Sequence, residues 1–225
     1  MNGERRFADR RDAGRALGEA LRPRFHGRAD LLVLGLPRGG IPVAYEVAKA
    51  LEAPLDAFLV RKLGAPGQPE LAMGAVAAGG VCVLDEDLVR RLGVSRERVA
   101  LIAARERTEL VRRAQAFRGD LPDPVVKGTT TLLVDDGLAT GSTLRAAARA
   151  LRKFGPARLV AAVPVGAEES CAAVARDVDE VVCLVTPRPF RAVGQGYDDF
   201  EQTTDDEVRD LLARWRASRP SREAS

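Results

Sequence analysis

Two adjacent acids open a short loop that ends in hydroxyl residues, in the middle of the chain. Asp135 and Asp136 follow an apolar run over residues 131–134, and the loop continues through Ala139, Thr140, Gly141, Ser142 and Thr143. Apolar residues then recur at helical spacing, so the loop leads into the first turn of an amphipathic helix. The amides of a first turn lack intrahelical acceptors, and small residues allow an anion to approach them. Residues 139–143 therefore predict a phosphate site.

The two acids suit a different part of the same ligand. Carboxylates would repel a second phosphate, but they accept hydrogen bonds from the hydroxyls of a neutral sugar. A phosphate beside a diol describes a ribose 5-phosphate. We therefore interpret Asp135 and Asp136 as the residues that bind the sugar hydroxyls.

Three other interpretations of this loop compete with a sugar phosphate site. A Walker loop requires a Gly-Lys-Ser/Thr ending, and this loop contains no lysine. A dinucleotide-binding loop requires G-x-G-x-x-G, a spacing that the glycines at 35, 39 and 40 or at 137 and 141 do not have. A capped helix without a ligand remains open, although a cap alone does not need two acids and three hydroxyls.

Two more loops follow predicted strands. Residues 31–34 lead to Pro37, Arg38, Gly39 and Gly40, and residues 55–60 lead to Arg61 and Lys62. Ligands of open α/β sheets bind at the carboxyl ends of the strands, so we expect the loops at 37–40, 61–62 and 136–143 to meet. A glycine turn that serves only geometry, and a pair of solvated cations, are the alternatives.

The central motif resembles the signature of the type I phosphoribosyltransferases, which bind phosphoribosyl pyrophosphate (PRPP). That signature has four apolar residues, two acids, two mostly apolar residues, and small or hydroxyl residues ending in Ser or Thr. Residues 132–143 resemble it, with three of the four apolar positions at 132–134. Gly137 stands where the family more often has an aliphatic residue. The resemblance implies that Asp135 and Asp136 hold the ribose hydroxyls and that residues 139–143 hold the 5-phosphate.

The resemblance also implies roles for the other two loops. Pro37, Gly39 and Gly40 would form the pyrophosphate loop, with a cis peptide between Pro37 and Arg38, and Arg61 would be its basic partner. Arg38 and Lys62 would stabilise the leaving pyrophosphate. Mg²⁺ is the implied cofactor, bridging pyrophosphate and ribose oxygens, with Asp135 and Asp136 as candidate direct ligands. Residues 63–80 would form the flexible loop that closes over the substrate.

Aromatic residues gather in an irregular segment, residues 186–200, which contains Phe190, Tyr197 and Phe200. These rings either form a small core under a C-terminal helix or stack on a planar base. The segment partly resembles the hood of the purine-type phosphoribosyltransferases, in which Asp199, or its neighbour Asp198, would accept hydrogen bonds from a purine edge. Arg188 or Arg191 could instead bind an acidic base such as orotate.

The elements that must position these residues alternate between strand and helix along the chain. Apolar runs at 159–164 and 178–185 and helical patterns at 9–21, 42–51, 95–117 and 168–176 complete the series. This alternation predicts one doubly wound α/β domain, a three-layer Rossmann-like fold of the type I phosphoribosyltransferase kind with a mostly parallel sheet. We expect a core over residues 30–185, a hood over 186–200, a helix over 204–216 and a polar tail over 217–225.

Composition restricts the function classes. The 225 residues carry a net charge of +3 with both signs interspersed, which argues against a nucleic-acid partner, and no apolar run is long enough to span a membrane. A single histidine argues against a zinc site and against a histidine-assisted nucleophile. Three scattered cysteines, interpreted as buried thiols, and the absence of a signal peptide predict a cytoplasmic protein.

The predicted function is the transfer of a phosphoribosyl group from PRPP to a nitrogenous base, on the purine side, with release of pyrophosphate. The implied partners are PRPP, a small base and a second copy of the chain in a homodimer. Two alternatives stay open at this point: a PRPP-sensing regulator without turnover, and an enzyme that acts on another phosphosugar.

Overall fold

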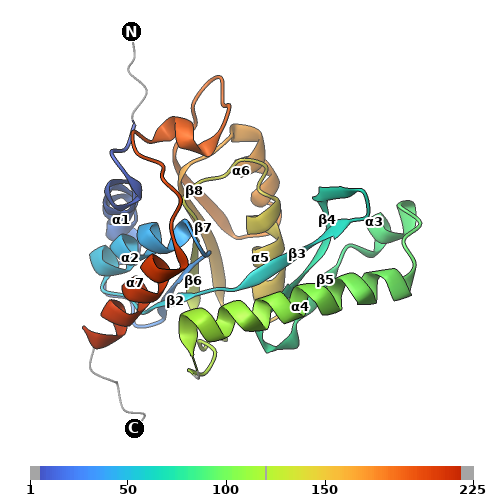
Figure 1. Cartoon of the computed structure of the whole chain (residues 1–225). Coiled ribbons are helices and arrows are strands. Elements are labelled where there is room, and N and C mark those ends of the chain that lie inside the picture. The colour runs from blue at the N-terminus through green and yellow to red at the C-terminus, as the bar shows by residue number, and fades with distance from the viewer. Residues whose placement is uncertain (1–5, 120, 219–225) are drawn as a thin grey trace.

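A five-stranded parallel sheet forms the centre of the computed structural model, which describes residues 6–119 and 121–218. Its strands lie in the order β2 (Leu55–Ala57), β1 (Leu31–Gly35), β6 (Thr130–Val134), β7 (Arg158–Val165) and β8 (Glu180–Val185) (Figure 1). All four neighbouring pairs are parallel. The chain winds outward from β1 in one direction and from β6 in the other, so the predicted doubly wound fold is confirmed.

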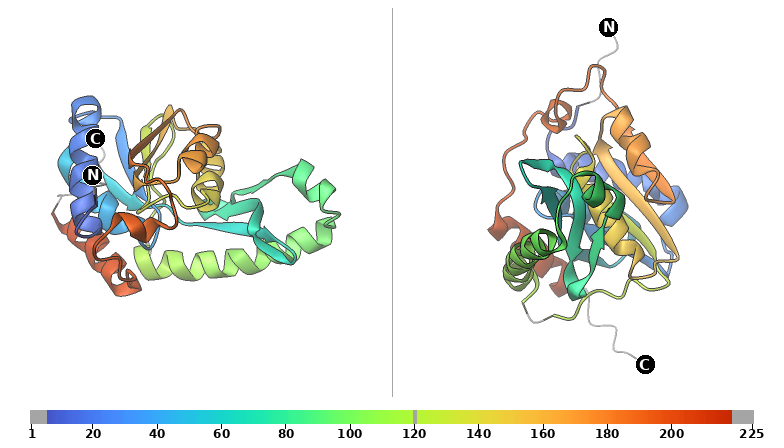
Figure 2. Two further views of the ribbon diagram at one scale, coloured as in Figure 1. Left: turned by 90° about the horizontal axis from the view of Figure 1, so that it is seen from above. Right: turned by 90° about the vertical axis from the view of Figure 1, so that its right-hand side faces the viewer.

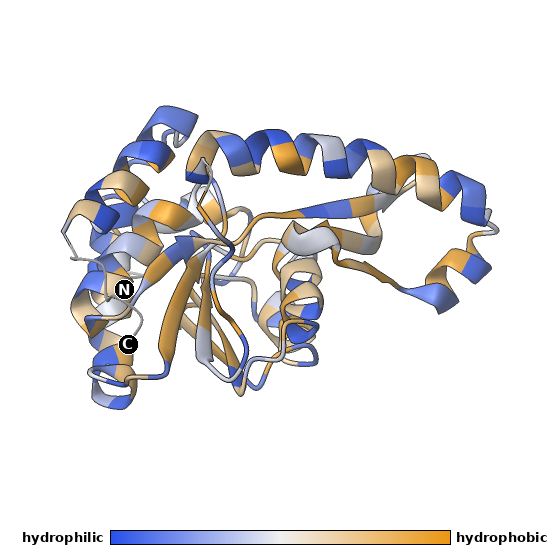
Figure 3. Ribbon diagram, turned by 90° about the horizontal axis from the view of Figure 1, so that it is seen from below, coloured by the Kyte–Doolittle hydropathy of each residue, from blue (hydrophilic) through white to orange (hydrophobic). Residues whose placement is uncertain are grey.

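Helices cover both faces of this sheet. One face carries α1 (Arg10–Phe25), α2 (Gly40–Leu51) and α7 (Asp205–Ala217), and the other carries α5 (Ser142–Arg152) and α6 (Glu168–Val174) (Figure 1). Alternate strand residues divide between the faces: Leu132 packs on the first and Leu133 on the second. Figure 3 shows the strands as the apolar centre of the molecule.

The chain segment that connects β2 to β6 forms an arm that projects from this body (Figure 2). It contains an antiparallel sheet of β3 (Val60–Ala65), β4 (Gln68–Ala77) and β5 (Cys82–Leu84), the 3₁₀ turn Ala78–Gly80, and the helices α3 (Glu86–Arg91) and α4 (Arg96–Arg118). Small cores of its own, with Leu63, Met73 and Val99 among their members, lie between its sheet and α4.

The arm corrects two predictions. The strand expected over residues 55–60 ends at Ala57, and the chain enters a different sheet at Val60, so Arg61 and Lys62 lie inside β3 and not at a strand end. Residues 63–80, expected as a mobile loop with a short hairpin, form most of a three-stranded sheet. The helix predicted from Ser95 is confirmed as α4, with the Ser95 hydroxyl accepting a hydrogen bond from the Arg98 amide at 3.2 Å.

A buried arginine fastens the end of α4 to the body. The Arg118 side chain is 5% exposed and donates to Asp56 Oδ2 of β2 at 3.0 Å. It also donates to Asp123 and to the main-chain oxygen of Pro122, in the segment that leads to β6. Three parts of the chain therefore meet on one guanidinium.

Three smaller expectations have different outcomes. Cys82 is exposed and Cys171 and Cys183 are half-buried, so the interpretation of all three as buried is wrong. The C-terminal helix begins at Asp205, where Thr204 caps it, and ends at Ala217. The polar tail was expected over residues 217–225, of which 219–225 lie outside the described residues. Across the described ranges, each helix is either too short or too polar to cross a bilayer.

Candidate active site

The loop at 37–40 and the loop that begins with Asp135 lie against each other at the carboxyl edge of the sheet. β1 and β6 pair in register from Leu31 with Thr130 to Gly35 with Val134, so the segments after Gly35 and Val134 leave the sheet side by side. The Leu36 amide donates to the Val134 oxygen at 2.8 Å and continues the ladder. The loop at 37–40 therefore meets the acid pair, as the sequence predicted.

Glycines make this approach possible. A Cβ at Gly39 would lie 1.9 Å from Asp136 Oδ2, and a Cβ at Gly40 would lie 2.7 Å from the Val134 oxygen. Any larger residue at either position would displace the acid pair or the strand end. The peptide between Pro37 and Arg38 is cis, as the family resemblance implied.

The two acids occupy an environment that disfavours charge. Burial and the neighbouring Asp136 charge raise the pKa of Asp135 well above its ordinary value. Burial also raises the pKa of Asp136, and Arg10 opposes this rise through a hydrogen bond and its charge. The Asp136 amide donates to Asp135 Oδ1 at 2.9 Å, which fixes one carboxylate relative to the other. Such a pair favours ligands that donate hydrogen bonds, since a further anion would add to the repulsion.

Sequence reasoning missed Arg10 altogether, and it missed the contact that Tyr197 makes with Asp136. Arg10, in the first turn of α1, donates from Nε to Asp136 Oδ2 at 2.8 Å. The Tyr197 hydroxyl donates to the Asp136 main-chain oxygen at 2.5 Å. Arg10 is 126 residues away from Asp136 in the chain, and no local pattern marks it. Only the packing of α1 beside the sheet brings it to the site.

The predicted phosphate loop, residues 139–143, leads into α5 as expected. Gly141 precedes the helix with φ of 72°, a left-handed conformation that favours glycine. The Thr140 and Ser142 hydroxyl oxygens are 3.2 Å apart, while Ala139, Thr140 and Thr143 are exposed. The Ser142 amide donates to the Thr140 hydroxyl at 3.4 Å, and first-turn amides beside several hydroxyls can bind an anion.

A neighbouring helix holds this loop in place. The Ser170 hydroxyl of α6 donates to the Ala139 oxygen at 2.5 Å, and the Leu138 amide donates to the Val165 oxygen of β7 at 2.8 Å. Ser170 is a further residue that the sequence gave no reason to choose. The loop is therefore fixed from behind by α6 and β7, which leaves its amide side for a ligand.

The three predicted cations lie apart from one another. Arg38 Nη1 lies 3.6 Å from Asp205 Oδ1, at the start of α7. Arg61 Nε donates to Glu106 Oε2 of α4 at 2.8 Å, and Arg61 also lines a narrow cleft together with Pro37 and Thr143. Lys62 is directed to the opposite face of β3, because successive strand residues alternate, and its cross-strand neighbour Ala75 lines a cleft against α5. The cations thus surround the loops and do not form one cluster.

Comparison with known proteins agrees with this geometry. A family model described as the phosphoribosyl transferase domain matches residues 10–199. The chain belongs to the phosphoribosyl transferase family. It therefore carries a phosphoribosyltransferase domain, the domain type of a pentosyl-transferring enzyme.

Relatives extend this finding. Proteins from two strains of Mycobacterium tuberculosis, each named "Putative phosphoribosyl transferase", are 49% identical over 208 residues, which is 92% of this chain. The match spans 46% of each relative's length, so the chain covers about half of those proteins. The crystal structure of TT1426 from Thermus thermophilus is 45% identical, with a TM-score of 0.86 over 93% of this chain and 99% of that one.

Of the aromatic residues in the predicted hood, residues 186–200, Tyr197 packs inward. Tyr197 is 1% exposed, with its ring stacked on Phe200 at 4.8 Å between centroids and tilted against Phe7 at 5.9 Å. The prediction that Tyr197 stacks on a base is therefore corrected, because both neighbouring rings belong to the protein. The alternative, a small core under the C-terminal helix, is right about the core and wrong about the helix, since the rings pack beside Ala13 of α1.

Other hood residues lie at or near the surface. The Arg10 guanidinium lies over the Phe200 ring at 3.9 Å from its centroid, although Phe200 remains 37% exposed. Phe190 is half-buried, and Asp199 is exposed. Asp198 forms an ion pair with Arg6 at 3.1 Å.

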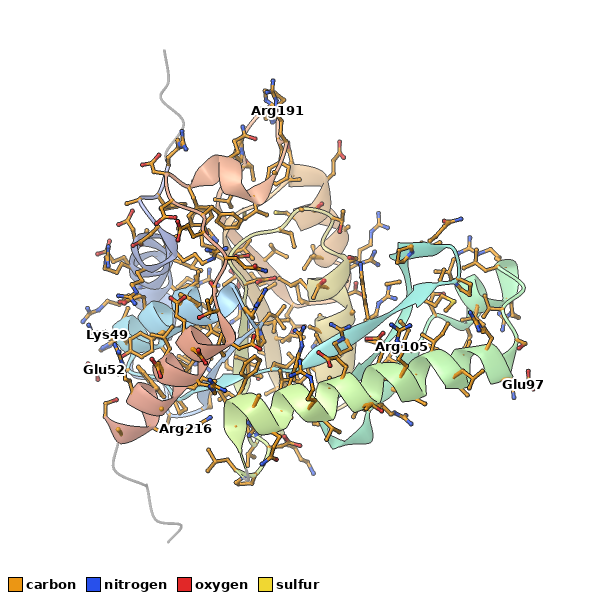
Figure 4. The ribbon with its side chains drawn as sticks, viewed as in Figure 1. Lys49, Glu52, Glu97, Arg105, Arg191 and Arg216 are labelled. Carbon is orange, nitrogen blue, oxygen red and sulfur yellow. The ribbon has the colours of Figure 1, made fainter. Side chains whose placement is uncertain are left out.

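Arg188 pairs with Glu168, and Arg191 extends away from the body at the tip of its loop (Figure 4). The two arginines proposed to bind an acidic base are thus not directed together at the acid pair.

Proposed function

We propose that this domain binds PRPP and transfers its phosphoribosyl group to a nitrogen of a base, with release of pyrophosphate. The observation that carries the proposal is the contact of the glycine loop at 37–40 with Asp135 and Asp136, beside an anion loop that opens α5. This arrangement offers one place for a diol between two places for phosphate groups. The family relationship supports the same ligand.

The reaction requires positioning more than covalent chemistry. As pyrophosphate leaves, the ribose ring gains positive charge, and protein groups act by holding the ring and stabilising the leaving group. Asp135 and Asp136 would accept hydrogen bonds from the ribose hydroxyls, and the amides of residues 139–143 would hold the 5-phosphate. Arg38 and Lys62 would stabilise the departing pyrophosphate, with Pro37, Gly39, Gly40 and Arg61 as its nearest neighbours.

Magnesium fits this site as an ion shared with the substrate. Within the described part of the chain, no cluster of three or more metal-binding side chains is present, whereas Asp135 and Asp136 supply carboxylate oxygens. Mg²⁺ commonly binds through one or two carboxylates together with substrate phosphates. When bound, it would offset the charge of the leaving pyrophosphate.

The anion loop gives a direct test of PRPP binding. Gly141→Val should weaken the affinity for PRPP by more than about tenfold, because valine disfavours the left-handed conformation and its Cβ would lie 3.2 Å from Val174 of α6, so the loop must shift and its amides lose their alignment toward the 5-phosphate. Isothermal calorimetry with PRPP and Mg²⁺ measures this change. Gly155→Val is the matched control, since Gly155 also has positive φ, at 71°, but lies beyond the far end of α5. Equal losses in the two variants would point to backbone strain and contradict the phosphate assignment.

The acceptor is proposed to be a purine-like base, with Phe190 and Asp199 as its contacts. Phe190→Ala should raise the acceptor KM by about tenfold, since stacking on a base contributes about 1–3 kcal/mol. Phe154→Ala, another half-buried aromatic, sits on the opposite side of the sheet against Phe58 and should leave the acceptor KM unchanged. An unchanged acceptor KM in the Phe190 variant would show that Phe190 of the hood does not take part in base recognition.

Product analysis tests the reaction itself. Incubation with PRPP, Mg²⁺ and a panel of purine and pyrimidine bases, followed by mass spectrometry, should yield one nucleoside monophosphate and pyrophosphate. Light scattering on the same samples measures whether the protein is the predicted homodimer. The cytoplasmic location stays a prediction. If PRPP binds but no base is consumed, the regulatory alternative gains support.

A further inference from the structure

Arg10 is a residue of the site region to which the proposed function assigns no role. Its guanidinium belongs to α1, yet it forms an ion pair with Asp136 in which both side chains are largely buried, at 12% and 17% exposure. Besides donating from Nε to Asp136 Oδ2, it donates from Nη1 to the Glu201 main-chain oxygen at 2.5 Å. One side chain thus joins α1, the acid pair and the segment that follows the hood.

A closed set of contacts fixes this guanidinium. The Arg10 guanidinium lies over the Phe200 ring, 3.9 Å from its centroid, and the Tyr197 ring also stacks on Phe200. Tyr197 in turn donates its hydroxyl to the Asp136 main-chain oxygen. The chain of contacts therefore starts at the Asp136 carboxylate and returns to the Asp136 backbone. A planar guanidinium that is both stacked and hydrogen-bonded keeps one orientation, which a lysine cannot reproduce.

The contacts also divide the two oxygens of Asp136. Oδ2 receives Arg10 and lies directly beside Gly39, where no Cβ could fit. A carboxylate offers about four acceptor positions on its two oxygens, so holding Oδ2 orients Oδ1 without using it. An oriented acceptor binds a hydroxyl more tightly than a rotating one, because less conformational freedom is lost on binding.

We propose that Arg10 is a positioning residue, which orients the Asp136 carboxylate to receive the hydroxyls of a ribose phosphate. In this role Phe200 and Tyr197 support Arg10 and Asp136, and the hood contributes to sugar selection. The inference rests on the proposed function, since it assigns Asp136 to the sugar. If Arg10 only connected α1 to the hood, its replacement would not change how the protein recognises hydroxyl groups. As a positioning residue, Arg10 must affect that recognition.

The experiment compares two sugars that differ by one hydroxyl. Calorimetry measures the affinities of ribose 5-phosphate and 2-deoxyribose 5-phosphate for the wild type, Arg10→Gln, Arg10→Lys and the control Arg15→Gln. Arg15 is also in α1, in an exposed pair with Asp12. We expect the wild type and the control to prefer the ribose by about tenfold, the value of one hydrogen bond to a charged acceptor. Arg10→Gln should lose most of this preference, and Arg10→Lys should keep part of it.

A second variant covers the case in which Arg10→Gln does not fold. Phe200→Leu keeps the ion pair but removes the stacked ring, and it should reduce the preference for ribose to an intermediate value. Combining Arg10→Gln with Asp136→Asn should cause no further loss of preference, because both changes act on the same carboxylate.

Three outcomes would overturn the inference. Full preference in Arg10→Gln shows that Arg10 does not orient Asp136, and full preference in Phe200→Leu shows that the stacked ring does not hold Arg10 in the orientation that this inference requires. Equal weakening of both sugars, with the preference intact, shows a structural tie only. If the wild type binds neither sugar, or binds both equally, the proposed role of the acids is wrong and this inference loses its basis. The wild type alone shows this result, so failure of the proposed function is distinguished from failure of the inference.

Discussion

Replacing Arg118 with methionine should lower the free energy of unfolding by about 3–5 kcal/mol, because it leaves a buried carboxylate without its partner. The carboxylate is Asp56 of β2. Burial raises its pKa above the ordinary value, and the charge of Arg118 opposes part of this rise. Methionine fills much of the space of the arginine stem, so the loss reports the ion pair and its hydrogen bonds more than a cavity. Urea unfolding followed by circular dichroism measures the change.

The pH dependence of this loss is an internal check. Without Arg118, a protonated Asp56 is tolerated better than a charged one, so the native state binds a proton more tightly than the unfolded chain. The penalty should therefore shrink as the pH falls toward the range in which carboxylates protonate. Arg112→Met, which removes an exposed pair with Glu109, should cost less than about 0.5 kcal/mol at any pH. A penalty for Arg118→Met that matches the control would contradict the anchoring role.

Changing Asp135 and Asp136 together to asparagine should weaken PRPP binding by at least about a hundredfold. Hydrogen bonds to charged acceptors contribute about 1.5–3 kcal/mol each, and about 1.4 kcal/mol corresponds to a factor of ten. The variant should still fold, because asparagine has the same shape and burial already opposes the charge at Asp135. Calorimetry with PRPP measures the affinity, and a urea titration measures the fold.

The control for this pair is Asp206→Asn, which removes an exposed acid at the start of α7. It should change neither affinity nor stability. Retained affinity in the double variant would sink the ribose assignment. A collapse of stability without ligand would instead assign the two acids a role in the fold.

The sequence predicted the body of the fold well because its strands are buried on both faces. Such strands appear as continuous apolar runs, and the runs at β1, β6 and β7 lie where they were expected. The run at residues 55–60 was misleading for the same reason. Apolarity shows that a segment is buried, but it does not show that Ala57 ends one sheet and Val60 begins another.

The candidate site divides in a similar way. Residues that depend on a strand end and the loop after it, such as Asp136 and Gly39, could be found because their neighbours are local or follow from parallel pairing. Arg10 could not be found, since its contact requires α1 to pack beside the sheet. Tyr197 was found for the wrong reason: aromatic content does not say whether a ring faces a ligand or the protein.

Helix α4 determines how the arm can move. Its 23 residues extend over about 35 Å, with Val99 and Ala103 in the cores of the arm and Leu110 and Phe117 in the core of the body. Sharp kinks occur mainly at proline or glycine, and α4 contains neither. The arm is therefore stiff along α4, from Glu97 at its tip (Figure 4) to Arg118, and is not a loop that folds over. At its inner end, Arg118 holds Asp56 of β2, and β2 pairs with β1, the strand that leads to the glycine loop beside the acid pair.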